Sequence, residues 1–106
     1  MKLIAFEVSL DVIRQLRPVL EQVRKHDSHL ADQLKRAAHN TAANLCEGQR
    51  RQAGNKRRAY ETAHGEAGEA LGWLQIAEAA GYAVEDAQVR RTMDRLLALL
   101  WGLCKR

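Results

Sequence analysis

Apolar residues recur along the first quarter of the chain at intervals of three and four, which is the spacing of one face of an α-helix. From Phe6 to His26 that face consists of Phe6, Leu10, Ile13, Leu16, Leu20 and Val23. The phase of the pattern is unchanged across Pro18, although a proline inside a helix removes one hydrogen bond and clashes with the preceding turn. The pattern therefore predicts one helix that is kinked near residues 14–17, rather than two helices.

A second helix is predicted to begin after the polar segment 26–29. Either Asp27 or Ser28 can cap it by accepting a backbone N–H from its first turn. The pattern continues to about Gln52, and Gly54-Asn55 is the next expected break. The apolar face of this segment is Leu30, Leu34, Ala37, Ala38, Thr41, Leu45 and Gln52.

The third apolar pattern runs over about residues 55–80 and contains three glycines. Its stripe is Tyr60, Ala63, Ala67, Ala70, Leu71, Leu74 and Ala77. Beside the stripe lie Gly65, Gly68 and Gly72. Each glycine costs up to about 1 kcal/mol relative to alanine inside a helix, so the three together predict a neighbouring helix that approaches closely. Gly81 is expected to end this helix in the left-handed conformation, with Tyr82 packed back on it.

The last pattern begins near residues 84–86, where Glu85 and Asp86 suit the positive end of a helix dipole. Its wide apolar face is Val89, Met93, Leu96, Leu97, Leu100, Leu103 and Cys104. Four helices of about 20 residues with short turns predict a single all-α domain over residues 1–106, an up-down-up-down antiparallel four-helix bundle. Trp73 and Trp101 do not fit cleanly inside that core, and the surplus apolar surface predicts self-association.

Composition agrees with a helical protein of a reducing compartment. The 106 residues include one proline and no run of β-branched residues with period two. The apolar stretches are short and interrupted by charge, unlike a membrane span, and the N-terminus becomes acidic too soon for a secretion signal. We therefore expect a cytoplasmic protein without membrane contact, in which Cys46 and Cys104 are small buried apolar residues rather than a disulfide.

Five cations lie close together where the second predicted helix gives way to the third. They are Arg50, Arg51, Lys56, Arg57 and Arg58. In most proteins such a cluster is a solvated turn, but the net charge of +4 permits a nucleic acid or acidic protein partner. Self-association would repeat the cluster and strengthen phosphate binding through counterion release. Tyr60 is the only aromatic residue near it in sequence, so we expect neither base stacking nor sequence readout.

Asn44 and Glu47 lie one turn apart, immediately before these cations. In one interpretation they form a site with Arg51, in which the carboxylate orients the guanidinium toward phosphate. In the other, which we favour, they belong to a buried structural polar network with Glu69 that ties the second helix to the third. A Glu47–Arg51 pair at i,i+4 stabilises a helix by a few tenths of a kcal/mol in either case.

Residues for catalysis or metal binding are not grouped in the sequence. Glu61 and His64 form one Glu-x-x-His, which is half of a ferritin-type di-iron site, and no second copy follows. The remaining histidines have no zinc-like spacing with cysteine, and Cys46 has no evident base. We expect no catalytic site, no metal and no cofactor.

Two motifs combine small, polar and charged residues at fixed spacing. The first is Ala43-Asn44-Leu45-Cys46-Glu47-Gly48 followed by Arg51, and the second is Ala63-x-Gly65-x-x-x-Glu69. Together with Gly81-Tyr82 they resemble a family of short four-helix-bundle proteins, the relatives of proteins encoded in intervening sequences of bacterial 23S rRNA genes. The resemblance is clearest over residues 34–82. The chain departs from the family pattern in having Cys46 in place of alanine and Glu66 in place of serine.

That family is similar to the accessory proteins of diversity-generating retroelements, which are basic pentameric barrels. The resemblance implies a homo-oligomer, most simply a pentamer, that binds RNA or DNA and a nucleic-acid-processing protein such as a reverse transcriptase, without enzymatic activity. Two hypotheses follow. The first is a non-enzymatic oligomeric bundle that binds nucleic acid without sequence preference. The alternative is a protein–protein adaptor or structural bundle with no nucleic-acid role.

Overall fold

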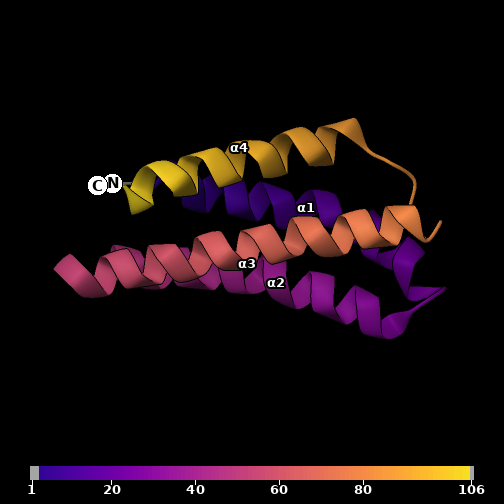
Figure 1. Ribbon diagram of the computed structural model, residues 1–106, viewed down its shortest axis with the longest axis horizontal. Helices are drawn as coiled ribbons and strands as arrows, with labels where there is room; N and C mark the ends of the chain where they lie inside the picture. The colour runs from indigo at the N-terminus through magenta and orange to yellow at the C-terminus, as the bar shows by residue number, and fades with distance from the viewer. Residues whose placement is uncertain (1–2, 106) are drawn as a thin grey trace.

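The computed structural model describes residues 3–105, which form four α-helices (Figure 1). They are α1 (Ile4–Arg24), α2 (Ser28–Gln49), α3 (Ala53–Ala79) and α4 (Ala87–Cys104). Successive helices run in opposite directions, and each packs against the two helices that flank it around the bundle. The molecule measures 43 × 23 × 20 Å. The predicted all-α antiparallel four-helix bundle is confirmed.

One core runs along the bundle and is rich in alanine on α2 and α3. Large buried side chains come from all four helices, among them Leu16, Leu34, Leu45, Leu74 and Leu100. Between them lie small residues of α3, which are buried as predicted: Ala63, Ala67 and Ala70. Small side chains allow two helix axes to approach closely, and α2 and α3 form the most extensive helix–helix contact.

Local signals fix three helix ends. The Asp27 carboxylate accepts a hydrogen bond from the N–H of Leu30 at 2.9 Å and caps α2. Asp86 caps α4 in the same way, by accepting from the backbone of residues 88 and 89. Gly81 ends α3 with φ of 81°, and the N–H of Tyr82 donates to the carbonyl oxygen of Ala77 at 2.9 Å. This is a Schellman motif, so the predicted role of Gly81 is confirmed.

Other helix ends differ from the prediction. Helix α1 is continuous through Pro18, as expected, but begins at Ile4 and ends at Arg24. Helix α2 ends three residues before the predicted Gln52, and the expected break at Gly54 falls inside the first turn of α3. The chain reverses over residues 50–52 and then passes through Ala53, whose φ is 47°. A left-handed conformation at a non-glycine residue cannot be read from local sequence signals.

The prediction that the α3 glycines mediate helix contact is wrong within the protomer. A Cβ atom at Gly65, Gly68 or Gly72 would meet nothing within 4 Å. The close approach occurs instead at Gly48 of α2, where a Cβ would lie 2.5 Å from Cε1 of the Tyr60 ring. The three α3 glycines lie beside the buried stripe and not on it, so a side chain at any of them would extend into open space.

The predicted burial of the cysteines also needs correction. Cys46 is exposed and Cys104 is half-buried. Each helical residue is rotated by about 100° from the one before it, so burial of Leu45 turns Cys46 outward. Gln52, which was placed on the same apolar face, lies beyond the end of α2 and is exposed.

Candidate nucleic-acid interface

The five predicted cations all lie at one end of the bundle, where α2 ends and α3 begins (Figure 1). We call them the basic connection: Arg50, Arg51, Lys56, Arg57 and Arg58. Lys56 is half-buried and the other four are exposed. The start of α1 and the end of α4 lie at this end too, so Lys105, directly after α4, adds a sixth cation nearby.

Arg51 is held by Glu47, one helical turn earlier. Its Nε donates to Oε1 of Glu47 at 2.7 Å, and its Nη2 donates to the same oxygen. The i,i+4 pair expected from the spacing is therefore present. The Arg51 and Glu47 side chains are 53% and 50% exposed, so the pair stabilises the helix by only about 0.3–0.5 kcal/mol. Its clearer effect is to fix the direction of the guanidinium.

A shallow polar depression of about 240 Å³ lies between α2 and α3 beside this pair. Two guanidinium groups, two amides and one hydroxyl line it, together with the Glu47 carboxylate: Asn44, Glu47, Arg51, Asn55, Arg58 and Thr62. Arginine presents several N–H donors in a planar fork that matches a phosphate group. The depression has the donors to bind a phosphate ester, and Glu47 supplies a carboxylate that orients one of them.

The predicted buried polar network is not found in that form. Asn44 is half-buried and donates to the carbonyl oxygen of Asn40 at 2.8 Å, within its own helix. Glu47 and Glu69 are both exposed. Over residues 3–105 no hydrogen bond or ion pair joins Glu69 to Asn44 or Glu47. Glu69 lies on α3 well beyond Thr62, the last α3 residue that lines the depression, and is too far along the helix to share it.

Two neighbouring cations of the basic connection, Arg57 and Arg58, lie on different faces of α3. Arg58 faces the depression beside α2, whereas Arg57 acts on Cys104 of α4. Burial raises the pKa of the Cys104 thiol, the negative charge of Glu61 raises it further, and Arg57 acts in the opposite direction. Consecutive residues on a helix point about 100° apart, which separates these two arginines.

The aromatic residue at this end is not the one expected from the sequence. Tyr60 is only 6% exposed, because its ring packs against Gly48. Trp101, far away in sequence, is 56% exposed near the end of α4, and the Lys105 ammonium lies 5.6 Å from the centroid of its ring. Only the antiparallel pairing of α3 with α4 brings it close to the cations.

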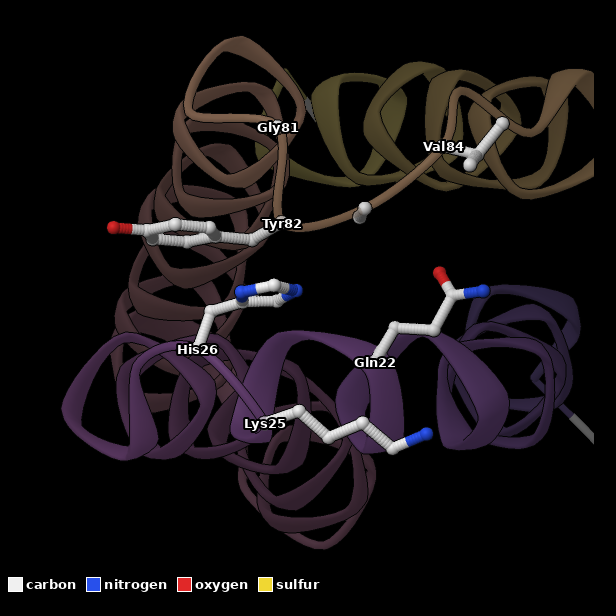
Figure 2. A pocket seen from close by; sticks show the side chains of 7 residues that line it. Gln22, Lys25, His26, Gly81, Tyr82 and Val84 are labelled. Atoms are coloured by element: carbon white, nitrogen blue, oxygen red, sulfur yellow. The ribbon is translucent and has the colours of Figure 1, made fainter.

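A second depression lies at the opposite end of the bundle (Figure 2). There Tyr82, after α3, stacks on His26, after α1, with ring centroids 5.1 Å apart and an interplanar angle of 6°. Gln22 and Val84 complete the rim, and Lys25 is the single cation. One cation provides far less phosphate attraction than the basic connection does, so the Tyr82–His26 contact is best understood as closing this end of the bundle.

Two further findings concern metal binding and membrane insertion. Within residues 3–105 no group of three or more His, Cys, Asp or Glu side chains is arranged to hold a metal ion. In the same part of the chain, no helix combines the length and the apolar character needed to cross a membrane.

Comparison with known proteins places the chain in a family. No curated protein sequence matches it. Its structure is similar to the crystal structure of a protein with unknown function from the S23 ribosomal protein family of Bacteroides thetaiotaomicron. The TM-score is 0.87 at 17% identity, and the match covers 96% of this chain and 99% of the other, which establishes the shared fold. The 23S rRNA-intervening sequence protein family matches residues 1–102, nearly the whole chain, and the protein described here therefore belongs to that family.

Proposed function

We propose that this protein is a non-enzymatic, oligomeric helical bundle that binds RNA or DNA without sequence readout, through the basic connection. The observation that carries the proposal is the grouping of these cations, four of them exposed, at one end of the bundle. Around them the depression between α2 and α3 supplies further hydrogen-bond donors of the kind that contact a nucleic-acid backbone.

The chemistry of these donors favours binding over reaction. Guanidinium groups stay protonated at neutral pH, and amide side chains neither accept protons nor attack a substrate under those conditions. The other two polar groups of the depression are engaged within the protein, since the Glu47 carboxylate pairs with Arg51 and the Thr62 hydroxyl donates to the carbonyl oxygen of Arg58. Contacts to phosphate oxygens fix the position of a nucleic acid but carry no sequence information directly. The proposal therefore assigns the site a backbone-binding role and no reaction.

Self-association is part of the proposal and would multiply this weak site. An apolar groove between the start of α1 and the end of α4 supports it, lined by Leu3, Ile4, Ala5, Ala98, Leu99, Gly102 and Leu103. Ile4 is 58% exposed there, and a second copy would cover it. By the resemblance described above, the expected assembly is a ring of five, which would repeat the basic connection around one face.

The experiment is a titration of labelled RNA and DNA with the full chain at low and increasing salt. We expect weak binding without sequence preference, with a log–log salt slope of about −0.9 per neutralised phosphate for duplex and about −0.7 for single strands. The double variant Arg57→Glu/Arg58→Glu should lose binding and keep its helicity, because both side chains are exposed.

A matched control separates a local effect from a change in net charge. Arg91 and Arg95 are exposed cations on α4, outside the basic connection. The variant Arg91→Glu/Arg95→Glu makes the same change in charge and should retain most of the binding. Equal losses in the two double variants, or no complex of the parent with RNA or DNA at low salt, would contradict the proposed site.

A further inference from the structure

Trp101 is a large aromatic side chain left on the surface at the basic end of the bundle. It lies near the end of α4 and is 56% exposed. Single exposed apolar residues are common on protein surfaces and need no special explanation. What distinguishes Trp101 is the chemistry of the groups around its ring.

Two neighbours hold the indole ring. The Nζ of Lys105 lies 5.6 Å from the centroid of the Trp101 ring, within the range of a cation–π attraction. The imidazole of His64, on α3, lies 6.0 Å from that ring at an interplanar angle of 44°, within the range for paired aromatic rings. The indole therefore has a cation from the residue after α4 and an imidazole from α3 within contact range, and more than half of its surface stays exposed.

The surface on either side of this group differs in character. Toward the end of the bundle lies Arg57, whose charge acts on the Cys104 thiol, three residues after Trp101. Toward the middle lies Gly68, one turn beyond His64 on α3, where a Cβ would meet nothing within 4 Å. Cations border Trp101 on one side, and α3 presents bare backbone on the other, where a flat group could approach closely.

We propose that Trp101 is a stacking platform for an unpaired base of single-stranded RNA or DNA, whose neighbouring phosphates are bound by Lys105 and Arg57. Aromatic side chains flanked by cations bind single strands in this way, because every base has a π face and every nucleotide a phosphate. Bases inside a duplex are already stacked on one another. This proposal rests on the proposed function above and adds a preference for single strands to it.

The carboxylate of Glu61 opposes this binding. Its charge acts on the same Cys104 thiol as that of Arg57, so it would repel a phosphate bound there. Replacing Glu61 with glutamine is therefore expected to tighten the binding of single strands severalfold.

The test follows Trp101 directly by its fluorescence. The chain has two tryptophans, so full-length protein carrying Trp73→Phe retains Trp101 as its only indole. This parent is titrated with a short oligouridylate, an oligothymidylate and a duplex of equal length. We expect saturable quenching by both single strands, at lower concentrations than are needed for the duplex.

Two substitutions at Trp101 separate stacking from apolar burial. Trp101→Leu should weaken single-strand binding about ten- to hundredfold, which is the contribution of one stacked base, and should leave duplex binding unchanged. Trp101→Phe keeps an aromatic ring and should retain most of the affinity. Both are measured by anisotropy of the labelled oligonucleotides, with light scattering to record the oligomeric mass.

Three outcomes would contradict the stacking proposal, and they differ in what they imply for the basic connection. Equal single-strand affinity of Trp101→Leu and the parent would overturn the stacking proposal and leave binding through the basic connection in place. A loss of oligomeric mass in Trp101→Leu with unchanged nucleic-acid binding would assign Trp101 to a contact between copies, which also overturns it. Failure of the parent to bind any of the three probes would overturn the proposed function and the stacking proposal together.

Discussion

At the scale of single residues, Gly48 determines how closely α2 approaches α3. A Cβ atom there would lie 2.5 Å from Cε1 and 2.8 Å from Cδ1 of Tyr60, and 3.3 Å from Cβ of Ala59. The Tyr60 ring is only 6% exposed, so any shift of the ring would have to be taken up by the residues packed around it. The absence of a side chain at Gly48 is therefore what allows the Tyr60 ring to lie against α2.

Gly48→Ala tests this contact, because two effects of known size oppose each other. Alanine improves the helix propensity by up to about 1 kcal/mol, whereas overpacking typically costs about 1–3 kcal/mol. We expect the second to prevail and the urea midpoint to fall. The control is Gly68→Ala, which gains the same propensity in open space and should raise the midpoint. A midpoint of Gly48→Ala at or above that of the parent would show that Tyr60 yields at little cost.

A second prediction concerns the Cys104 thiol, whose pKa is raised first by burial and then by Glu61. Glu61→Gln removes the negative charge, so the Cys104 pKa should fall and a larger fraction of thiolate should be present at a given pH below it. The thiolate is the reactive form, so alkylation should become faster. The measurement is the rate of iodoacetamide modification against pH in a Cys46→Ser background, where only Cys104 reacts. Superimposable profiles with and without Glu61 would contradict the placement of this carboxylate.

At the scale of helices, the sequence predicted faces better than ends. The spacing of three and four residues identified the buried face of each helix correctly, because every such face is defined by many apolar residues together. Asp27 (or Ser28) and Gly81 were recognised as end signals because their capping chemistry is local, whereas Asp86 was placed at the start of α4 only for its charge. The end of α2 was placed too late because the chain reverses over residues 50–52 and then passes through Ala53, a residue with no turn signal whose φ is 47°.

The buried stripe of α3 gives the test at this scale. Ala67 is 4% exposed and borders an internal cavity of only about 10 Å³. Ala67→Leu adds three carbon atoms that this space cannot hold, so we expect a loss of about 1–3 kcal/mol in the free energy of unfolding. Ala79→Leu, at an exposed position of the same helix, is the matched control and should change it little. An unchanged denaturation midpoint for Ala67→Leu would be incompatible with its buried position.

At the scale of the whole molecule, the candidate site combines features that the sequence shows with others that it hides. The density of cations after residue 49 was visible directly. The division of Arg57 from Arg58 between two faces of α3 depends on the phase of a helix whose first residues carry no apolar pattern. The approach of Trp101 to these cations depends on the antiparallel packing of α4 against α3, which local sequence does not show. Glu69, which belongs to the second sequence motif, lies apart from the cations.

The final prediction concerns assembly. The groove between α1 and α4 leaves Ile4 58% exposed, and a charge there would be buried without a partner in a contact between copies, a large cost. Wild-type protein should scatter light as a homo-oligomer, most simply five protomers of 11.9 kDa, and Ile4→Glu should reduce the mass to that of one protomer while the circular dichroism stays helical. Val84→Glu, at a 77% exposed position near the opposite end of the bundle, places the same charge outside the groove and should leave the assembly intact.

A wild-type mass of 11.9 kDa at micromolar concentration would contradict self-association, and with it the proposal that repeated basic connections strengthen nucleic-acid binding. An oligomer that resists Ile4→Glu would place the contact on another face.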